Sequence, residues 1–310
     1  MPDQTVDNVV FIAGPTASGK SALAINLARE IGGEIVNADA MQVYRELKIL
    51  SARPSEEEQA DVAHHLFGVL SGDEPCSAGC WAAMAAPVIS DVLAREKCAI
   101  IVGGTGLYFR TLEQGLSPIP DVPPDVRAEA RARRERLGAD AFYAEVVAAD
   151  PPMARIAPGD TQRLLRAWEV HRATGKPLSS FQAAPGAPIV ANPCARLVLA
   201  PDRENLYARC DVRFDAMMAA GALDEARALL AAEFDPQLPI MKALGAAELL
   251  AHLRGDLDLD AAIDLAKRNT RRFAKRQMTW FRNQTPDWLR VQTPDEARSV
   301  LNRAFFASGA

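Results

Sequence analysis

The sequence predicts an α/β protein in which a doubly wound parallel sheet forms the core and an all-helical domain is inserted. Three observations lead to this fold class. Short apolar runs typical of buried strands alternate with segments of helical periodicity, and a glycine-containing turn joins the first strand to the first helix. Two proline-rich stretches also bracket a segment that has helical patterning and no convincing strand.

Four short apolar runs predict the strands of the sheet, at residues 9–13, 34–39, 98–102 and 196–200. After the first run, Leu23, Leu27 and Ile31 recur on one side of a helical pattern. Because strands and helices alternate, the sheet should be parallel, with helices on both faces. After residue 200 the pattern is helical to the end, and helices are expected at 205–220, 223–233, 261–283 and 294–306.

The proline-rich stretches 117–124 and 185–193 set the expected domain boundaries. We predict a catalytic core formed by residues 1–115 and 196–310, with the C-terminal helices belonging to it. Residues 116–195 are predicted to form a helical insertion that is hinged on the two stretches. At 310 residues the chain is long enough for such a core and one further unit.

The composition is that of an ordinary soluble globular protein, with 49% hydrophobic and 24% charged residues. No segment is long and apolar enough to cross a bilayer, and residues 1–4 lack the features of a signal peptide. We therefore expect a cytoplasmic monomer without a membrane partner. Five scattered cysteines and only four histidines argue against a structural zinc site and favour free thiols.

Local charge differs from the overall charge of the chain. The net charge of −5 excludes a uniformly basic protein, but nucleic-acid binding requires only a local positive face. Residues 127–136 carry five arginines, and residues 267–276 carry six basic residues and no acid.

Residues 14–21 read GPTASGKS and match the phosphate-loop pattern G-x-x-x-x-G-K-[ST] between an expected strand and an expected helix. The candidate phosphate-binding residues are Gly14, Pro15, Thr16, Ala17, Ser18, Gly19, Lys20 and Ser21. Backbone N–H groups and the helix N-terminus favour phosphate oxygens, while Lys20 supplies a charge and Ser21 a hydroxyl for Mg²⁺. The core should thus be P-loop NTPase-like. Nucleotide-binding, ATP-binding and diphosphate-binding enzymes share this loop, so the pattern alone does not name the reaction.

Ligands of a parallel sheet collect beyond the carboxyl ends of its strands, which draws attention to Asp39 and Thr105. Asp39 is a candidate general base or metal-binding group, and the alternative is the N-cap of a helix. Thr105 follows two glycines that permit close backbone approach, and the alternative is a plain turn. Arg209 and Arg213 lie one helical turn apart and would address one anion together, unless they form a solvated helix face.

Five segments carry a resemblance to one family: GPTASGKS at 14–21, DAMQVY at 39–44, GGTGLYFR at 103–110, DTQRLLRAWEV at 160–170 and RRFAKRQMTWFR at 271–282. In this order and spacing the chain resembles the bacterial tRNA dimethylallyltransferases, also called isopentenyl-diphosphate:tRNA transferases, from about residue 9 to about residue 284. The resemblance implies transfer of a dimethylallyl group from its diphosphate to N6 of the adenosine next to the anticodon, in tRNAs that read codons starting with U.

The same resemblance implies roles for individual residues. Asp39 would be the general base on the adenine amino group, and Thr105 would hold the reacting centre from the other side. The loop, Arg209 and Arg213 would bind the diphosphate of dimethylallyl diphosphate together with Mg²⁺. The implied tRNA contacts are Asp39, Ala40, Met41, Gln42, Thr105, Arg127, Gln162, Arg163, Leu164, Leu165, Arg166, Lys242 and the stretch 271–278, in which Arg272, Lys275 and Arg276 are the basic residues singled out. We expect Arg163 and Arg166 to project outward and Leu164 and Leu165 to pack.

The sequence departs from the family at two places. Ala40 stands where serine is common, and Ala246 stands where a tyrosine often follows the glycine, so a contact to RNA or substrate is expected to be missing at each. His64 and His65 recur in the family, but we expect structural roles for both.

Three other readings stay open on the residues alone. A small-molecule kinase and a prenyltransferase of free AMP or ADP would share the loop and the acid. Neither would need the basic helical surfaces. A nucleic-acid binder without enzymatic activity would leave the loop, Asp39 and Thr105 without a purpose.

Overall fold

The computed structural model describes residues 7–184 and 186–306 and divides the chain into two compact units. The larger unit is formed by Met1–Glu113 and Ile189–Ala310, and the smaller unit by Gln114–Pro188. The expectation about residues 1–4 and the first residue of the proline-rich stretch 185–193 lie outside the described residues. Among the described residues, no helix is long and apolar enough to span a membrane.

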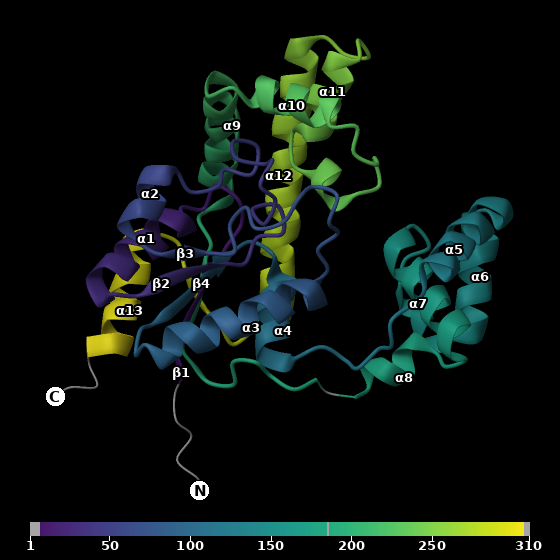
Figure 1. Ribbon diagram of the computed structural model, residues 1–310, viewed down its shortest axis with the longest axis horizontal. Helices are drawn as coiled ribbons and strands as arrows, with labels where there is room; N and C mark the ends of the chain where they lie inside the picture. The colour runs from purple at the N-terminus through teal and green to yellow at the C-terminus, as the bar shows by residue number, and fades with distance from the viewer. Residues whose placement is uncertain (1–6, 185, 307–310) are drawn as a thin grey trace, which may run out of the picture. The chain divides into compact units, whose positions relative to one another are not determined.

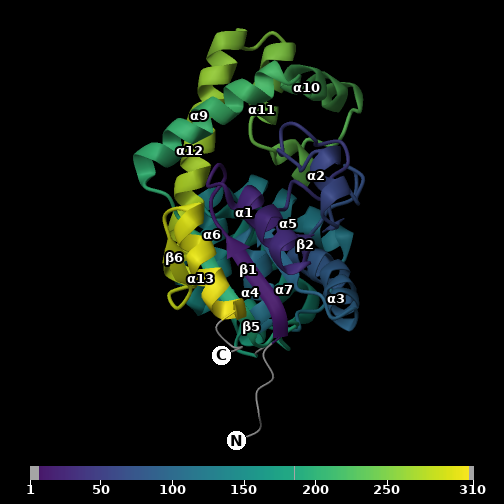
Figure 2. The ribbon, with the colours of Figure 1, turned by 90° about the vertical axis from the view of Figure 1, so that its left-hand side faces the viewer.

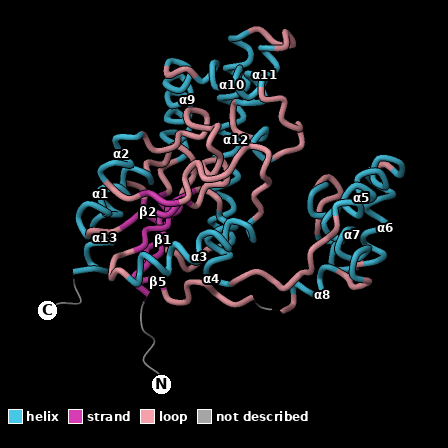
Figure 3. The backbone as a smooth tube through the Cα atoms, viewed as in Figure 1, coloured by secondary structure: helices cyan, strands magenta, loops and turns pink. Residues whose placement is uncertain are grey.

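A six-stranded sheet forms the centre of the larger unit, where Figure 3 shows its strands in magenta. The strand order is β3-β2-β4-β1-β5-β6, and all neighbouring strands pair in parallel. The strands are β1 (Asp7–Ala13), β2 (Glu34–Asn37), β3 (His64–His65), β4 (Ala99–Gly103), β5 (Pro193–Leu199) and β6 (Leu289–Val291). The four strands expected from the sequence are confirmed. The expectation of a purely helical C-terminal region is wrong at β6, because a strand this short carries no detectable periodicity.

Alternating side chains of the strands pack into two hydrophobic layers, so the sheet is doubly wound as predicted. On one face Val10, Ile12 and Leu199 pack with α1 (Lys20–Ile31) and α13 (Pro294–Phe306). α13 contacts β5 and α1, and Figure 2 shows it in yellow on the side that faces the viewer. On the other face Phe11 and Val198 pack with α3 (Ala78–Ala94), α4 (Gly106–Gln114) and the C-terminal part of α12 (Leu259–Gln284).

The remaining helices of the larger unit surround the carboxyl ends of the strands, and α12 runs along α9 (Figure 1). They are α2 (Glu56–Asp61), α9 (Arg203–Ala219), α10 (Ala222–Ala231), the 3₁₀ turn η2 (Pro239–Lys242) and α11 (Ala246–Leu253). The helices expected at 205–220, 223–233, 261–283 and 294–306 are confirmed as α9, α10, α12 and α13, whereas α11 was not expected.

The smaller unit contains only helices among its described residues. They are α5 (Pro124–Leu137), α6 (Ala139–Ala149), the 3₁₀ turn η1 (Pro151–Arg155), α7 (Thr161–Thr174) and α8 (Leu178–Gln182). They share a core of their own, formed by Phe142, Val146, Leu164 and their neighbours. The unit ends at Pro188, whereas the sequence placed the boundary at residue 195; residues 193–195 lie in β5 because they pair with β1.

Candidate active site

The phosphate loop lies between the carboxyl end of β1 and the start of α1. Gly19 has φ +98°, a backbone conformation that side chains disfavour, and a Cβ atom there would lie 3.0 Å from Nη2 of Arg209. Ala17 also has a positive φ, 61°. The backbone therefore turns tightly into α1, and glycine at residue 19 leaves room for the Arg209 guanidinium beside the loop.

Cations from two helices meet at a cavity of about 550 Å³ beside this loop. Lys20 and Ser21 line it from α1, and Arg209 and Arg213 line it from α9. Burial lowers the pKa of Lys20 to about 8; the nearby Asp39 carboxylate opposes this shift and Arg213 adds to it. Burial also lowers the pKa of Arg213. Arg213 is half-buried and lines the cavity, so its side chain is not on a fully solvated helix face. Lys20, Arg209 and Arg213 outnumber the carboxylates of Asp39 and Glu58 beside them, and a diphosphate would neutralise this excess of positive charge.

Asp39 and Thr105 lie on two loops that are hydrogen-bonded to each other. The backbone N–H of Ala40 donates to Oγ1 of Thr105 (3.0 Å), and the N–H of Thr105 donates to the carbonyl of Ala38 (3.1 Å). One carboxylate oxygen of Asp39 accepts from the N–H of Met41 (2.9 Å). Asp39 thus closes a short turn and is not the N-cap of a helix, while its other oxygen has no hydrogen bond among the described residues.

The residues around Asp39 mostly serve the loop itself. The side-chain amide of Gln42 donates to the carbonyls of Ser51 and Ala52, both at 3.0 Å. Ala40 contributes its backbone N–H to Thr105, so this contact does not require a serine side chain. Met41 is half-buried against the core. Ala246, the other departure from the family, is fully buried at the start of α11 and has a packing role.

The sequence did not single out Gln277, which contacts the loops on β1 and β4 at the same time. Its Oε1 accepts from the backbone N–H of Thr16 (2.9 Å), and its Nε2 donates to the carbonyl of Gly104 (2.9 Å). Gln277 lies within RRFAKRQMTWFR, on the face of α12 where Ala266, Ala274 and Phe281 recur at helical spacing, and this periodicity could have indicated its burial. Only the crossing of α12 over the strand ends reveals its contacts.

The basic stretch of α12 has an outer and an inner side. Arg272, Lys275 and Arg276 are exposed, as is Lys242 at the end of η2. Arg271, which the resemblance assigned to the RNA surface, is half-buried and paired with a carboxylate oxygen of Asp211 on α9 (2.6 Å). The side chain of Arg271 therefore joins α12 to α9, and the RNA contact expected from it stays a prediction.

The candidate RNA contacts of the smaller unit divide in the same way. Arg127, Gln162 and Arg163 are exposed, and Arg166 is half-buried beside Glu169. Leu164 is 1% exposed in the core of this unit and Leu165 packs against that core. The expectation that the leucines pack and Arg163 projects is confirmed. The RNA contacts expected at these residues stay predictions.

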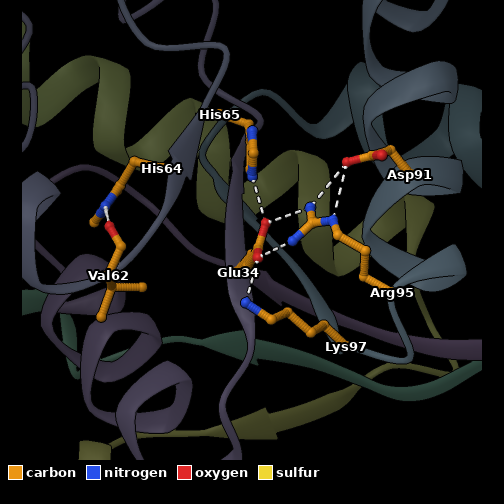
Figure 4. Close-up of polar contacts among 7 residues, drawn as sticks. All are labelled: Glu34, Val62, His64, His65, Asp91, Arg95 and Lys97. Atoms are coloured by element: carbon orange, nitrogen blue, oxygen red, sulfur yellow. Dashed lines mark hydrogen bonds and ion pairs between the residues drawn. The ribbon is translucent and has the colours of Figure 1, made fainter.

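His64 and His65 lie at β3 and serve the structure, as expected (Figure 4). Nδ1 of His64 lies 2.6 Å from the carbonyl of Val62, and Nε2 of His65 lies 2.8 Å from the carboxylate of Glu34. Glu34 also accepts from Arg95 (2.9 Å) and Lys97 (2.8 Å) at the start of β2, far from the phosphate loop in the register of the sheet. All five cysteines are free thiols, and the described residues contain no group of three or more His, Cys, Asp or Glu side chains arranged to hold a metal ion.

Comparisons with known proteins converge on one group of enzymes. Residues 42–284 match the family model described as IPP transferase, and residues 7–67 match the model described as isopentenyl transferase. A tRNA dimethylallyltransferase of Phenylobacterium zucineum is 54% identical over 265 residues, which cover 85% of this chain and 86% of the relative. The enzyme of the same name from Parvibaculum lavamentivorans is 52% identical, with 87% of this chain and 86% of the relative covered.

Solved structures show the same similarity. The tRNA isopentenylpyrophosphate transferase of Bacillus halodurans has 32% sequence identity and a TM-score of 0.69, with 98% of this chain and 96% of that chain covered. A eukaryotic dimethylallyltransferase that acts on tRNA has 27% identity and a TM-score of 0.80, with 97% and 79% covered.

Proposed function

From the premise that the chain belongs to the IPP transferase family, whose members transfer prenyl groups, we propose that it transfers the dimethylallyl group of dimethylallyl diphosphate to N6 of the adenosine next to the anticodon. Its substrates would be tRNAs that read codons starting with U, and diphosphate would be released. A tRNA substrate also places the protein in the cytoplasm.

One observation carries this proposal. The carboxylate of Asp39 and the hydroxyl of Thr105 lie on two loops that are hydrogen-bonded to each other, at the same strand ends as the positively charged phosphate loop. Asp39 follows β2, Thr105 follows β4, and the phosphate loop follows β1. The hydrogen bond from Ala40 to Thr105 fixes the first two loops relative to each other. Such a site has separate places for a leaving diphosphate and for a nucleophile that must lose a proton.

The chemistry assigns the cations to the leaving group. As the allylic C–O bond breaks, negative charge builds on the diphosphate, and Lys20, Arg209, Arg213 and the loop N–H groups would stabilise it. The adenine amine is a weak nucleophile that becomes acidic once it is bonded to carbon. Asp39 would accept that proton through its free carboxylate oxygen, and Thr105 would hold the reacting centre from the other side.

We assign Mg²⁺ to the diphosphate side of the site, with Ser21 as the protein ligand. Ser21 is exposed in the first turn of α1 and lines the cavity. Mg²⁺ commonly takes few protein ligands and completes its shell with phosphate oxygens and water, which fits the lack of an acidic cluster among the described residues. The ion would add charge stabilisation for the departing diphosphate.

The RNA contacts are proposed for the exposed cations. Arg272, Lys275 and Arg276 lie on the outer side of α12, and Arg127 and Arg163 lie on the surface of the smaller unit. An adenine stacked in an anticodon loop cannot reach the strand ends, so the base must be extruded while its neighbours are held by phosphate and base-edge contacts.

A transfer assay tests the function. The protein is incubated with labelled dimethylallyl diphosphate and Mg²⁺, and in turn with unmodified tRNA or free AMP, while ATP consumption is followed in parallel. We expect label on tRNA alone. Label on AMP would favour a prenyltransferase of free nucleotides. ATP-dependent turnover would favour a kinase, and RNA binding without transfer would favour a nucleic-acid binder without enzymatic activity.

The dependence of tRNA affinity on salt tests the surface of the smaller unit. Reversing the charges of Arg127, Arg163 and Arg166 should flatten the log–log salt slope by about 0.7 to 0.9 for each lost phosphate contact, with the affinity for dimethylallyl diphosphate little changed. Arg227→Glu, Arg254→Glu and Arg298→Glu form a charge-matched control on the larger unit. If both triple variants change the affinity for tRNA and its salt dependence equally, the effect comes from the net charge of the protein, and the proposed RNA contacts of the smaller unit are wrong.

A further inference from the structure

Helix α12 rests directly on the two loops that flank the proposed reaction centre. A Cβ atom added to Gly104 would lie 2.3 Å from Nε2 of Gln277 and 3.3 Å from the carbonyl oxygen of Gly14. A Cβ atom added to Gly106 would lie 2.1 Å from the ring of Trp280. No side chain therefore separates α12 from the loop that carries Thr105, and small shifts of the helix reach that loop.

Gln277 is the polar link within this contact. It is only 7% exposed, and both ends of its amide are hydrogen-bonded to backbone groups of different strand-end loops. One loop, through Thr16, belongs to the diphosphate site, and the other, through Gly104, precedes Thr105. An apolar side chain would leave the Thr16 N–H and the Gly104 carbonyl without this partner, and an ionised carboxylate would face the Gly104 oxygen with no proton to donate.

We propose that Gln277 is a positioning residue that sets the spacing between the phosphate loop and the Thr105 loop, and thereby between the leaving diphosphate and the adenine amine. The two loops leave the neighbouring strands β1 and β4, which pair as far as Ala13 and Gly103, with the N–H of Gly14 donating to the carbonyl of Gly103 (3.3 Å). Beyond this last backbone contact, Gln277 joins Thr16 and Gly104 from a third element. Since a misplacement of about 1 Å between reacting groups costs about a hundredfold in rate, this contact has a direct kinetic consequence. The expected effect of Gln277 on the transfer rate rests on the proposed function, whereas its effect on the spacing of the two loops does not.

Helix α12 also connects this contact to the surface. Arg272, Lys275 and Arg276 are exposed on the helix whose inner side carries Gln277. An RNA held by these cations would therefore be held by the same rigid element that spaces the two loops. Arg271 fixes α12 to α9, on which Arg209 and Arg213 lie.

Two substitutions at this residue separate positioning from general stability. Gln277→Met keeps the approximate shape and loses both hydrogen bonds, so kcat should fall about ten- to a hundredfold while the KM values for dimethylallyl diphosphate and tRNA change by less than about threefold. Gln277→Glu can accept from Thr16 in either state, but donates to the Gly104 carbonyl only when it is protonated. Burial and that hydrogen bond both raise the pKa of a carboxyl group in this position.

The pH profile then identifies the role. Activity of Gln277→Glu relative to the unaltered protein should rise as pH falls from about 8 to about 6, whereas the relative activity of Gln277→Met should stay flat. Activities are normalised to the folded fraction measured by circular dichroism at each pH. Asn283→Asp adds the same charge to an exposed amide position of α12 and should show neither effect.

Amide hydrogen exchange gives a readout that does not depend on the reaction. The N–H of Thr16 should exchange faster in Gln277→Met, with the core strands still protected. If the unaltered protein fails to transfer the prenyl group, the proposed function is wrong. The exchange rate at Thr16 would still show whether Gln277 holds the phosphate loop. Unchanged kcat in both variants, or unchanged exchange at Thr16, would overturn the inference.

Discussion

The two ends of the parallel sheet bury charge in opposite ways. At the amino end of β2, the carboxylate of Glu34 is almost fully buried and accepts hydrogen bonds from Arg95 and Lys97, with His65 beside it. These partners hold the pKa of Glu34 well below its usual range, led by the hydrogen bonds from Arg95. At the carboxyl ends of the strands, Lys20 and Arg213 are half-buried, and this burial lowers the pKa of both, although Lys20 donates a hydrogen bond to the carbonyl of Pro15 (3.2 Å).

This difference distinguishes the structural charge of Glu34 from the charges of Lys20 and Arg213, which we assign to ligand binding. Glu34 has its partners within the fold, so its charge is stabilised without a ligand. Lys20 and Arg213 share Asp39 as a nearby acid, Glu58 also lines their cavity, and an added anion would neutralise the remaining positive charge. His65, one of the two histidines expected to recur in the family, lies at the first end and the phosphate loop at the second, so recurrence in a family does not by itself indicate catalysis.

The largest expected effect is at the functional end. Asp39→Asn keeps an oxygen that accepts from the Met41 N–H but removes the base, so turnover should fall by about two to four orders of magnitude with tRNA affinity within a few fold. Single-turnover transfer and an RNA-binding titration measure the two quantities. Turnover of Asp39→Ala should be at least as slow as that of Asp39→Asn, because alanine also loses the hydrogen bond from the Met41 N–H that closes the turn. Full activity of Asp39→Asn would end the assignment of Asp39 as the base.

At the structural end, the expected effect is on stability alone. Glu34→Gln should lower the free energy of unfolding by about 2 kcal/mol, a figure reduced from that of a fully buried pair because Arg95 and Lys97 are partly exposed. Urea unfolding measures it, and prenyl transfer per folded molecule should be unchanged. Asp91→Asn, which removes an exposed neighbour of Arg95, should cost much less.

The sign of the pH dependence sharpens the same contrast. Because the pKa of Glu34 is lowered in the folded protein, its contribution to stability is present above the ordinary glutamate pKa of 4.5 and is lost as pH falls toward the folded value. The stability difference between Glu34→Gln and the unaltered protein should therefore narrow from about pH 5 to about pH 3. A difference that is constant over this range would show that Glu34 titrates normally.

The smallest expected effect concerns Lys20, whose pKa of about 8 makes its charge sensitive to mildly alkaline pH. Binding of a diphosphate favours the protonated amine, so affinity for dimethylallyl diphosphate should weaken above that pH, by up to about tenfold per unit. Lys20→Arg keeps its charge throughout, and dividing the two binding profiles removes the ionisation of the ligand. A ratio that does not change with pH would mean that Lys20 stays charged or lies away from the diphosphate.

Local patterns determined the parts of this protein that depend on neighbours in sequence. The four longer strands, α1, α9 and α12, the phosphate loop and the outward direction of Arg163 all follow from residues within one or two turns of each other. The two shortest strands could not be predicted in this way. β3 and β6 have two and three residues, and they are strands only because a neighbouring strand pairs with each of them.

The tertiary structure alone decided which side chains meet across long separations in the chain. Gln277 contacts Thr16 over 261 residues and Arg271 contacts Asp211 over 60. The spacing of apolar residues in α12 indicates its inner face but not the partners that this face meets. The physical reason is that burial and partner choice are set by the packing of elements, whereas the sequence by itself records the residues that each element offers.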